Sequence, residues 1–374
     1  MKLINDDYER IEIESPEVLP SLREHFGNLF NGTNLAILNG DAKETLKQLP
    51  NDSVHCCVTS PPYYKLRDYG AKGQIGQETT LSAYIDSLVS VFHEVKRVLH
   101  PSGTLWLNLG DTYSNKSLMM VPARVVMALQ DAGWTLRSNI VWHKKAPMPE
   151  SITDRPTNAW EPIYLLSKNT EYFYDAEAVK EPSVGPKNTR PFGKAKNADR
   201  NDQGRTFTYS SKRNLRNVWQ LGPEPYRGSH FAPFPTEIPR RAILAGTSER
   251  GCCPVCFNPW KRVVEKKHIS GVYGDLRKRA DAPSAVTSKT SVFRTGDAVE
   301  TRTAGWKPTC NCGCGESHTL PCIVLDVFGG SGTSGKVALE LGRRGVLVEL
   351  NPEYCKLAKE RCLGEPVVRK LIGQ

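Results

Sequence analysis

The chain contains no apolar run that approaches the ~18 residues a helix needs to cross a membrane. Its first residues, Met1 to Asp7, include two acids and lack the apolar stretch of a secretory signal. There is no internal repeat. These absences predict a cytoplasmic protein without a membrane partner.

Acidic residues are the minority among the charged side chains. Forty aspartates and glutamates face 50 lysines and arginines, which gives a formal net charge of +10. This excess favours a polyanionic partner, because contacts with phosphates release counterions, although many enzymes are basic as well. The length of 374 residues allows a sizeable core and suggests two or three domains. Eleven cysteines in a reducing compartment predict metal ligation or buried thiols rather than disulfides.

Apolar patterns predict strands that alternate with helices in the first and last parts of the chain. The predicted strands are 34–38, 54–59, 104–109, 136–142, 162–166, 323–328 and 345–350. The predicted helices are 42–49, 81–99, 122–130, 239–244, 334–341 and a last one from Pro352. Pro101-Ser102-Gly103 is expected to stop the second helix. Such alternation indicates an α/β fold with a mostly parallel sheet covered on both faces.

Apolar residues become scarce between about Lys180 and Asn217, where the charge is strongly positive. Three acids oppose nine basic residues: Lys187, Arg190, Lys194, Lys196, Arg200, Arg205, Lys212, Arg213 and Arg216. One interpretation is a solvated, partly disordered loop, and the other is a surface that contacts nucleic acid. Both hold if the loop becomes ordered only on its partner.

Two short segments carry most of the chemistry. Thr59-Ser60-Pro61-Pro62-Tyr63 follows an apolar run and offers a hydroxyl, carbonyls and an aromatic face. Asp326 to Thr333 is a glycine loop after another apolar run. The loop and Glu349 also fit the dinucleotide fingerprint, and Lys336 nearly completes a P-loop in which Val337 replaces the Mg²⁺ ligand. Taken alone, the loop does not separate NAD, ATP and S-adenosylmethionine, or exclude a turn without a ligand.

As a pair, the two segments resemble motif IV and motif I of the amino-methylating DNA methyltransferases. They stand in the permuted β order, with the catalytic loop first, and the resemblance covers most of the chain. It implies an α/β, Rossmann-like, S-adenosylmethionine-dependent methyltransferase sheet that acts on double-stranded DNA. A cognate restriction endonuclease and the oligomeric state are left open. The alternative from another class is a zinc-stabilised DNA-binding protein without catalysis, and RNA or protein substrates stay open.

The resemblance also implies the cofactor site. Its motif I residues are Asp326, Phe328, Gly329, Gly330, Ser331, Gly332 and Thr333. Glu349 would bind the ribose hydroxyls, Asp41 the adenine amine, and Phe234-Pro235 the methionine end. A Gly-Asp pair before a helix is also an ordinary N-cap, so Asp41 has a structural alternative.

The catalytic residues implied are Ser60, Pro61, Pro62 and Tyr63. An exocyclic amine is a poor nucleophile because its lone pair is delocalised, and two acceptors aimed at its protons free that pair. In the family that the chain resembles, Ser60 Oγ and the Pro61 carbonyl would be those acceptors, and Tyr63 would stack on the extruded base. Ser-Pro-Pro-Tyr is associated with cytosine N4 products, and adenine N6 is the alternative.

Methylation at ring carbon C5 would use a Pro-Cys pair, and Pro321-Cys322 is such a pair. It precedes the cofactor strand and is discounted. The motif VIII neighbourhood of the family resembles two further segments, Val141 to Lys145 and Met148 to Ser151. Alternatively, these residues pack within a strand and form a solvated edge.

Two cysteine clusters have the spacing of metal-binding knuckles, Cys253-x-x-Cys256 and Cys310-x-Cys312-x-Cys314. A structural zinc site needs four thiolates, which we assign to Cys253, Cys256, Cys310 and Cys312. Cys252, Cys314 and His318 are the alternative ligands. The 53 residues between the clusters exceed the roughly 15–20 of a compact zinc ribbon, so unliganded thiols are the alternative.

These features predict five segments. Residues 1–180 form the catalytic half of the core, 181–229 the DNA-facing target-recognition segment, and 230–250 the helix region that closes over the cofactor. Residues 251–319 form the zinc-binding insertion, and 320–374 the cofactor-binding half.

Overall fold

The computed structural model describes residues 20–183, 212–222, 224, 234–269, 298–313 and 318–364. By its internal contacts the chain divides into two units. The first comprises Met1–Ala178, Arg216–Lys261 and Pro308–Gln374, and the second Val179–Leu215 and Arg262–Lys307. Most of the predicted target-recognition segment, including Arg205, lies outside the described residues, as does Cys314.

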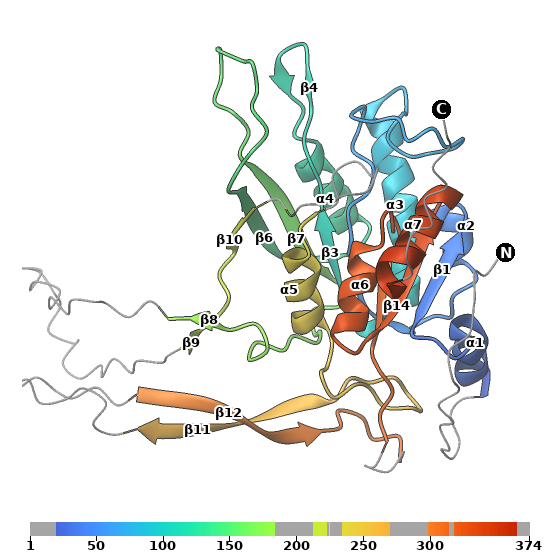
Figure 1. The fold of residues 1–374 in the computed structure, drawn as a ribbon, viewed down its shortest axis with the longest axis vertical. Coiled ribbons are helices and arrows are strands. Elements are labelled where there is room, and N and C mark those ends of the chain that lie inside the picture. The colour runs from blue at the N-terminus through green and yellow to red at the C-terminus, as the bar shows by residue number, and fades with distance from the viewer. Residues whose placement is uncertain are drawn as a thin grey trace, which may run out of the picture. The chain divides into compact units, whose positions relative to one another are not determined.

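The first unit is built on an eight-stranded sheet in the order β1-β14-β13-β2-β3-β7-β6-β10 (Figure 1). In that order the strands are Leu35–Asn39, Arg344–Glu349, Ile323–Asp326, Val54–Thr59, Leu99–Asn108, Trp160–Ser167, Thr135–Lys144 and Val218–Leu221. Only β7 runs antiparallel to its neighbours. The carboxyl ends of the other seven strands and the amino end of β7 therefore meet at one edge of the sheet.

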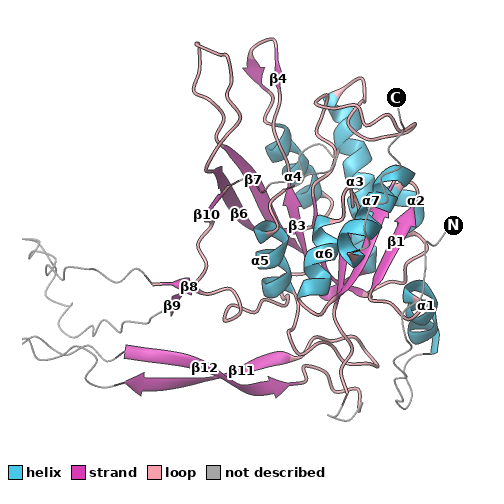
Figure 2. Cartoon of the chain, in the orientation of Figure 1, coloured by secondary structure: helices cyan, strands magenta, loops and turns pink. Residues whose placement is uncertain are grey.

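Helices cover both faces of this sheet, as the alternating pattern predicts (Figure 2). On one face lie α5 (Glu237–Gly246), α6 (Thr333–Glu340) and α7 (Pro352–Leu363), packed in that order. On the other face lie α2 (Ala42–Leu46), α3 (Leu81–Val98) and α4 (Val121–Asp131). The helix α1 (Pro20–Phe30) contacts β1. Strand β2 is buried along its whole length, because helices cover it on both sides.

Helix α3 shows how the sequence directs one of these layers. Thr80 caps its first turn by accepting a hydrogen bond from the Ala83 amide at 3.2 Å. Tyr84, Leu88, Val91, Phe92, Val95 and Val98 recur at helical spacing and are all buried. The predicted amphipathic helix is confirmed.

Helix α3 ends at Val98, before Pro101-Ser102-Gly103, as predicted, but the next strand begins earlier than the predicted residue 104. Strand β3 begins directly at Leu99 and includes all three residues. Leu99 pairs with Val54, and the register with β2 then shifts between Val54 and Cys56. The irregular pairing accommodates a proline, which has no N–H to donate to the ladder. The strand predicted over 323–328 ends at Asp326, which leaves Val327 and Phe328 in the glycine loop.

The described part of the second unit consists of two short antiparallel ribbons. One pairs β8 (Glu181–Pro182) with β9 (Lys212–Arg213), and the other pairs β11 (Lys261–Ile269) with β12 (Ala298–Lys307). An ion pair of 2.8 Å joins Arg213 to Glu181 in the first ribbon. Among the described residues, no helix has the length and apolar character that crossing a membrane requires.

Candidate active site

The carboxylate of Asp326 joins the two loops singled out in the sequence. Asp326 ends β13 and Thr59 ends the adjacent β2, and the Thr59 hydroxyl donates to Asp326 Oδ1 at 2.6 Å. Phe328 N–H donates to the same oxygen at 3.1 Å, and Ser334 Oγ donates to Oδ2 at 2.7 Å. Burial raises the pKa of Asp326, whereas these three bonds favour its charged form. The network fixes the residue before Ser60 against the start of the glycine loop.

The glycine loop is held by a second carboxylate, that of Glu349 at the end of β14. Gly330 N–H donates to Glu349 Oε2 and Asn351 N–H donates to Oε1, each at 2.8 Å. Burial raises the pKa of Glu349, while both amides stabilise the ionised form. Gly330 has φ 49°, a conformation that favours glycine. Each oxygen keeps a second lone pair for a ligand hydroxyl.

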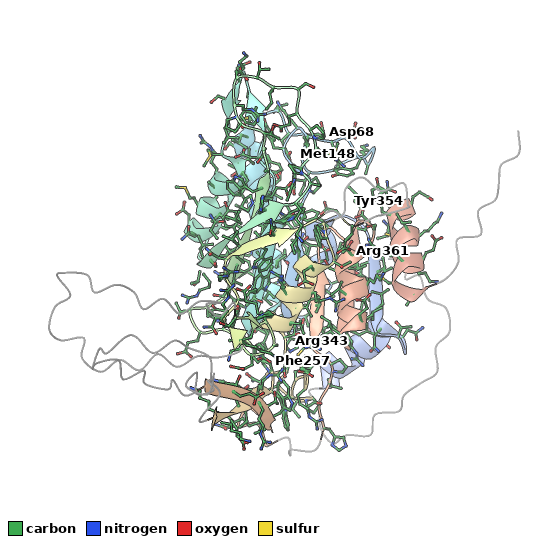
Figure 3. The ribbon with its side chains drawn as sticks, turned by 60° about the vertical axis from the view of Figure 1, so that its left-hand side comes forward. Asp68, Met148, Phe257, Arg343, Tyr354 and Arg361 are labelled. Carbon is green, nitrogen blue, oxygen red and sulfur yellow. The ribbon has the colours of Figure 1, made fainter. Side chains whose placement is uncertain are left out.

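The rest of the loop packs against α7. A Cβ added to Gly332, which has φ 78°, would lie 2.9 Å from the Ala358 Cβ. One guanidinium nitrogen of Arg361 donates to Ser331 Oγ at 2.8 Å and to Thr333 Oγ1 at 2.7 Å. Arg361 and Tyr354 mark α7 in Figure 3. Gly332, Ser331 and Thr333 thus shape the loop through its helix contacts.

A pocket with about 740 Å³ of empty space, part of it open to solvent, lies between the two loops. Of the predicted site residues, Asp41, Ser60, Pro62, Phe328, Gly330 and Glu349 line it. The predicted site residues that are not part of its lining are Pro61, Tyr63, Phe234, Pro235, Asp326, Gly329, Ser331, Gly332 and Thr333. Asp41 is also the N-cap of α2, where its Oδ1 accepts from the Glu44 amide at 3.0 Å. The capping role is confirmed, and Asp41 also lines the pocket.

Several lining residues were missed by the sequence reasoning. The segment after the catalytic loop contributes Tyr69, Ala71, Gly73, Gln74 and Ile75, and the chain after β14 contributes Leu350, Asn351 and Tyr354. Gln74 Oε1 accepts from the Tyr69 amide at 2.8 Å, which closes the first segment on itself. The polar and glycine-rich stretch directly after Tyr63-Tyr64 is a sequence feature that could have indicated a loop at the site.

The catalytic loop is anchored at both prolyl and tyrosyl positions. The Tyr84 hydroxyl of α3 donates to the Pro62 carbonyl at 2.9 Å. Ser60 Oγ lies 3.4 Å from the Tyr63 hydroxyl and donates to it. The half-buried Tyr63 ring lies against Gly110, where an added Cβ would come within 2.2 Å of Tyr63 Cε2. Glycine at position 110 is therefore required for this ring position.

Glu161, at the amino end of β7, holds the Tyr63 hydroxyl. That hydroxyl donates to Glu161 Oε2 at 2.8 Å and lies 3.2 Å from Asn108 Oδ1. Asn108 Nδ2 donates to the same Glu161 oxygen at 3.2 Å, and Lys144 Nζ pairs with Oε1 at 2.5 Å. Burial and the nearby Glu161 raise the pKa of Tyr63 well above its usual value, so its hydroxyl remains a donor. Sequence reasoning missed Glu161 and Asn108, although each is a polar residue at the end of an apolar strand.

The predicted cysteines lie together. The four sulfur atoms of Cys253, Cys256, Cys310 and Cys312 all lie within 4.8 Å of one another. The Sγ atoms of Cys253 and Cys312 are 3.4 Å apart, and those of Cys312 and Cys310 are 3.6 Å apart. Val255 N–H donates to Cys253 Sγ at 3.4 Å, and Asn258 Nδ2 donates to Cys256 Sγ at 3.2 Å.

Two of the alternative ligands, Cys252 and His318, are not part of this group of four cysteines. Cys252 is buried in a separate group with His55 and Cys322. Both nitrogens of the His55 ring have protein partners there, the Phe257 carbonyl at 2.8 Å and the Ile323 amide at 3.0 Å. His318 is exposed. Cys322 is buried at the start of β13, as its position in the sequence predicts.

Comparison with known proteins identifies related sequences over most of the chain. The sequence model of the N6/N4 methyltransferase family, described as DNA methylase, matches residues 54–253 and 321–360. The type II methyltransferase M.SmaI of Serratia marcescens is 34% identical over 356 residues, which is 87% of this chain and 90% of the relative. The type II methyltransferase M.Cfr9I of Citrobacter freundii is 34% identical over 364 residues, 90% of this chain and 89% of the relative.

A solved structure shares the fold. The cytosine-N4-specific PvuII DNA methyltransferase superimposes with a TM-score of 0.53 over 88% of this chain and 86% of that chain. Its sequence identity is 18%, so the likeness concerns the architecture.

The Asp326 network yields a prediction about stability. We expect Thr59→Val to lower the free energy of unfolding by about 1–3 kcal/mol, because a buried carboxylate oxygen loses its closest donor. Urea denaturation measures the change. Thr135→Val, at the partly exposed first position of β6, is the matched control and should stay within about 0.5 kcal/mol of the parent. Equal effects of the two substitutions would show that the bond to Asp326 is not structurally important.

Proposed function

The chain belongs to the DNA methylase family of amino-methyltransferases, and we propose that it methylates the exocyclic N4 of a cytosine extruded from duplex DNA. The observation that carries the proposal is the Asp326 network, which joins the end of β2, directly before Ser60, to the glycine loop at a pocket that Ser60 and Pro62 line. The related proteins are methyltransferases, which argues against the alternative that this chain binds DNA without catalysing a reaction.

The pocket residues fit S-adenosylmethionine, the methyl donor that the family implies. Glu349 offers two carboxylate oxygens for ribose hydroxyls, and Asp41 an oxygen for the adenine amine. Gly330 presents a surface without a side chain, and Phe328, Ile75 and Tyr354 supply apolar and aromatic area. When bound, this donor supplies an electrophilic methyl group. Motif I residues outside the lining would act by shaping the loop, and Phe234-Pro235 by closing over the methionine end.

The catalytic loop fits an amine acceptor. The Ser60 hydroxyl donates its hydrogen bond to the Tyr63 hydroxyl, so the lone pairs of Ser60 Oγ are available to accept from the target amine. The second acceptor proposed is the Pro61 carbonyl, as the family resemblance implies, while the Pro62 carbonyl accepts from Tyr84. Two acceptors on the two amine protons free the nitrogen lone pair for attack, and one of these protons is released to water after transfer. Tyr63, fixed by Glu161 and Gly110, offers its ring for stacking on the extruded base.

The choice of base rests on the catalytic loop. Ser60 stands where most adenine enzymes that this chain resembles carry Asp or Asn, and a hydroxyl is a shorter acceptor than a carboxylate. Adenine N6 is the second candidate, because its amine presents the same two protons. Duplex DNA as the partner agrees with the net charge of +10. The basic segment 181–229 is proposed as the target-recognition part, and a cognate endonuclease as a further partner.

The product is the direct test. DNA from cells that express the protein should contain 4-methylcytosine when it is digested to nucleosides and analysed by mass spectrometry, and sequencing should place it in one short motif. DNA from cells expressing the Ser60→Ala protein is the control and should lack the modification. Detection of 6-methyladenine alone would overturn the base while leaving the family and the fold unchanged.

Two substitutions should separate cofactor binding from transfer. Gly330→Val should abolish S-adenosylmethionine binding in calorimetry, because a branched side chain is disfavoured at φ 49° and would enter the pocket. Tyr63→Ala should retain binding but slow transfer about 10- to 100-fold, since base stacking is worth roughly 1–3 kcal/mol.

Gly342→Val is the matched control for the first substitution. Gly342 has φ 70° and an added Cβ there meets no atom within 4 Å, so this variant carries the backbone strain without filling the pocket. It should bind the cofactor like the parent. If Gly330→Val also bound normally, the glycine loop would not be the cofactor site.

We further propose a structural zinc ion on Cys253, Cys256, Cys310 and Cys312. A tetrahedral zinc with Zn–S bonds of about 2.3 Å spaces its sulfurs about 3.8 Å apart, close to the 3.4 and 3.6 Å of two of the pairs. The N–H groups directed at Cys253 and Cys256 suit thiolate ligands. Four cysteines leave no open position, so the ion would fasten the two chain segments that flank β11 and β12.

Elemental analysis of protein purified without added metal should give about one zinc per chain. Cys253→Ser and Cys310→Ser should lower both the zinc content and the melting temperature. Cys362→Ser removes a thiol outside the cluster and should leave the zinc content unchanged. A parent protein that is folded but contains no metal would contradict the proposed zinc site.

A further inference from the structure

Two loops leave the sheet edge directly beside Tyr63. The first, residues 111–120, starts after Gly110, which touches the Tyr63 ring. The second, residues 145–159, lies between Lys144 and Glu161, whose ion pair closes its base and whose carboxylate binds the Tyr63 hydroxyl. We call them the twin loops, and Figure 1 shows both extending from the same end of the sheet.

The first loop is a tight hairpin. Asp111 Oδ1 accepts from the Thr112 and Val121 amides, each at 2.9 Å, which closes the base of the hairpin. At the tip, β4 (Tyr113–Ser114) and β5 (Ser117–Leu118) are joined by Asn115 and Lys116, with φ 48° and 66°. Two consecutive left-handed residues are typical of the type I′ turn, so the strands meet at a defined register.

The second loop is braced on the first. Lys116 Nζ lies 3.0 Å from Asp154 Oδ2, and the Arg155 guanidinium lies over the Tyr113 ring at 4.0 Å. Arg155 also pairs with Glu150 at 2.9 Å, and the Lys144 amide donates to the Ala159 carbonyl at 2.8 Å. The twin loops are therefore one connected projection.

This projection, whose base adjoins Tyr63, exposes apolar side chains. Met148 is 84% exposed, more than any other large apolar side chain among the described residues. Met120 and Leu118 are exposed at 51% and 42%. Met148 lies between two residues that form ion pairs, Lys144 with Glu161 and Glu150 with Arg155, so its loop is held in place. Figure 3 labels Met148 at the end of the sheet from which the loops project.

Extruding a base leaves a gap in the stacked duplex beside the enzyme. Proteins that distort DNA commonly fill such gaps with Met, Leu, Ile, Phe or Pro, because these side chains restore the lost stacking contacts. From this placement we propose that the twin loops dock on the duplex, and that Met148 enters the stack at the position vacated by the target nucleotide. This inference rests on the proposed function, for which it names the element that extrudes the base.

The test compares duplexes that differ opposite the target. Both carry the motif found by sequencing modified DNA, and the second has an abasic site in place of the partner base, so its target is already unpaired. Met148→Ala should slow methyl transfer to the paired duplex about tenfold or more, and to the abasic duplex by about twofold or less, because extrusion is then easy. Met148→Leu should restore most of the activity on the paired duplex.

Met127→Ala is the matched control. Met127 is 63% exposed but lies within α4, outside both twin loops, so its loss should leave transfer to both duplexes unchanged. A Met148→Ala protein with parental rates, or with equal losses on both duplexes, would overturn the proposal. A parent protein that methylates neither duplex nor genomic DNA would instead overturn the proposed function itself.

Discussion

The buried carboxylate of Asp326 is the constraint on which the two functional loops depend. It accepts hydrogen bonds from the last residue of β2, from the glycine loop and from the first turn of α6. A carboxylate removed from water is costly unless its oxygens have partners, so the three donors are held in one arrangement. The position of Ser60 relative to Gly330 follows from that arrangement.

The same interaction explains how a permuted chain builds one site. Thr59 and Asp326 are 267 residues apart in sequence, yet β2 and β13 are neighbours in the sheet. Parallel strands deliver their carboxyl ends to one edge whatever their order along the chain. Only β7 runs the other way, and this places Glu161 at the same edge, where it binds the Tyr63 hydroxyl.

The sequence predicted those features whose signal is local. The strands β2 and β13, the glycine loop and the cysteine quartet follow from runs and spacings within a few residues. Glu161 and Asn108 were missed because their role depends on which strands pair and in which direction. The strand predicted from residue 104 begins at Leu99 for a related reason, since the pairing of Leu99 with Val54 overrides the local preference. The N-cap role of Asp41 was visible in the sequence, whereas the close approach of Gly332 to Ala358 depends on the packing of α7.

The central claim is that one pocket edge serves both the methyl donor and an extruded cytosine. The most direct measurement is a crystal structure with S-adenosylhomocysteine and a duplex carrying the recognised motif. The account predicts the cofactor against Gly330 and Glu349, with the cytosine N4 at about 3 Å from Ser60 Oγ and the Pro61 carbonyl. A target base that remains stacked in the duplex, or a cofactor bound away from the glycine loop, would contradict it.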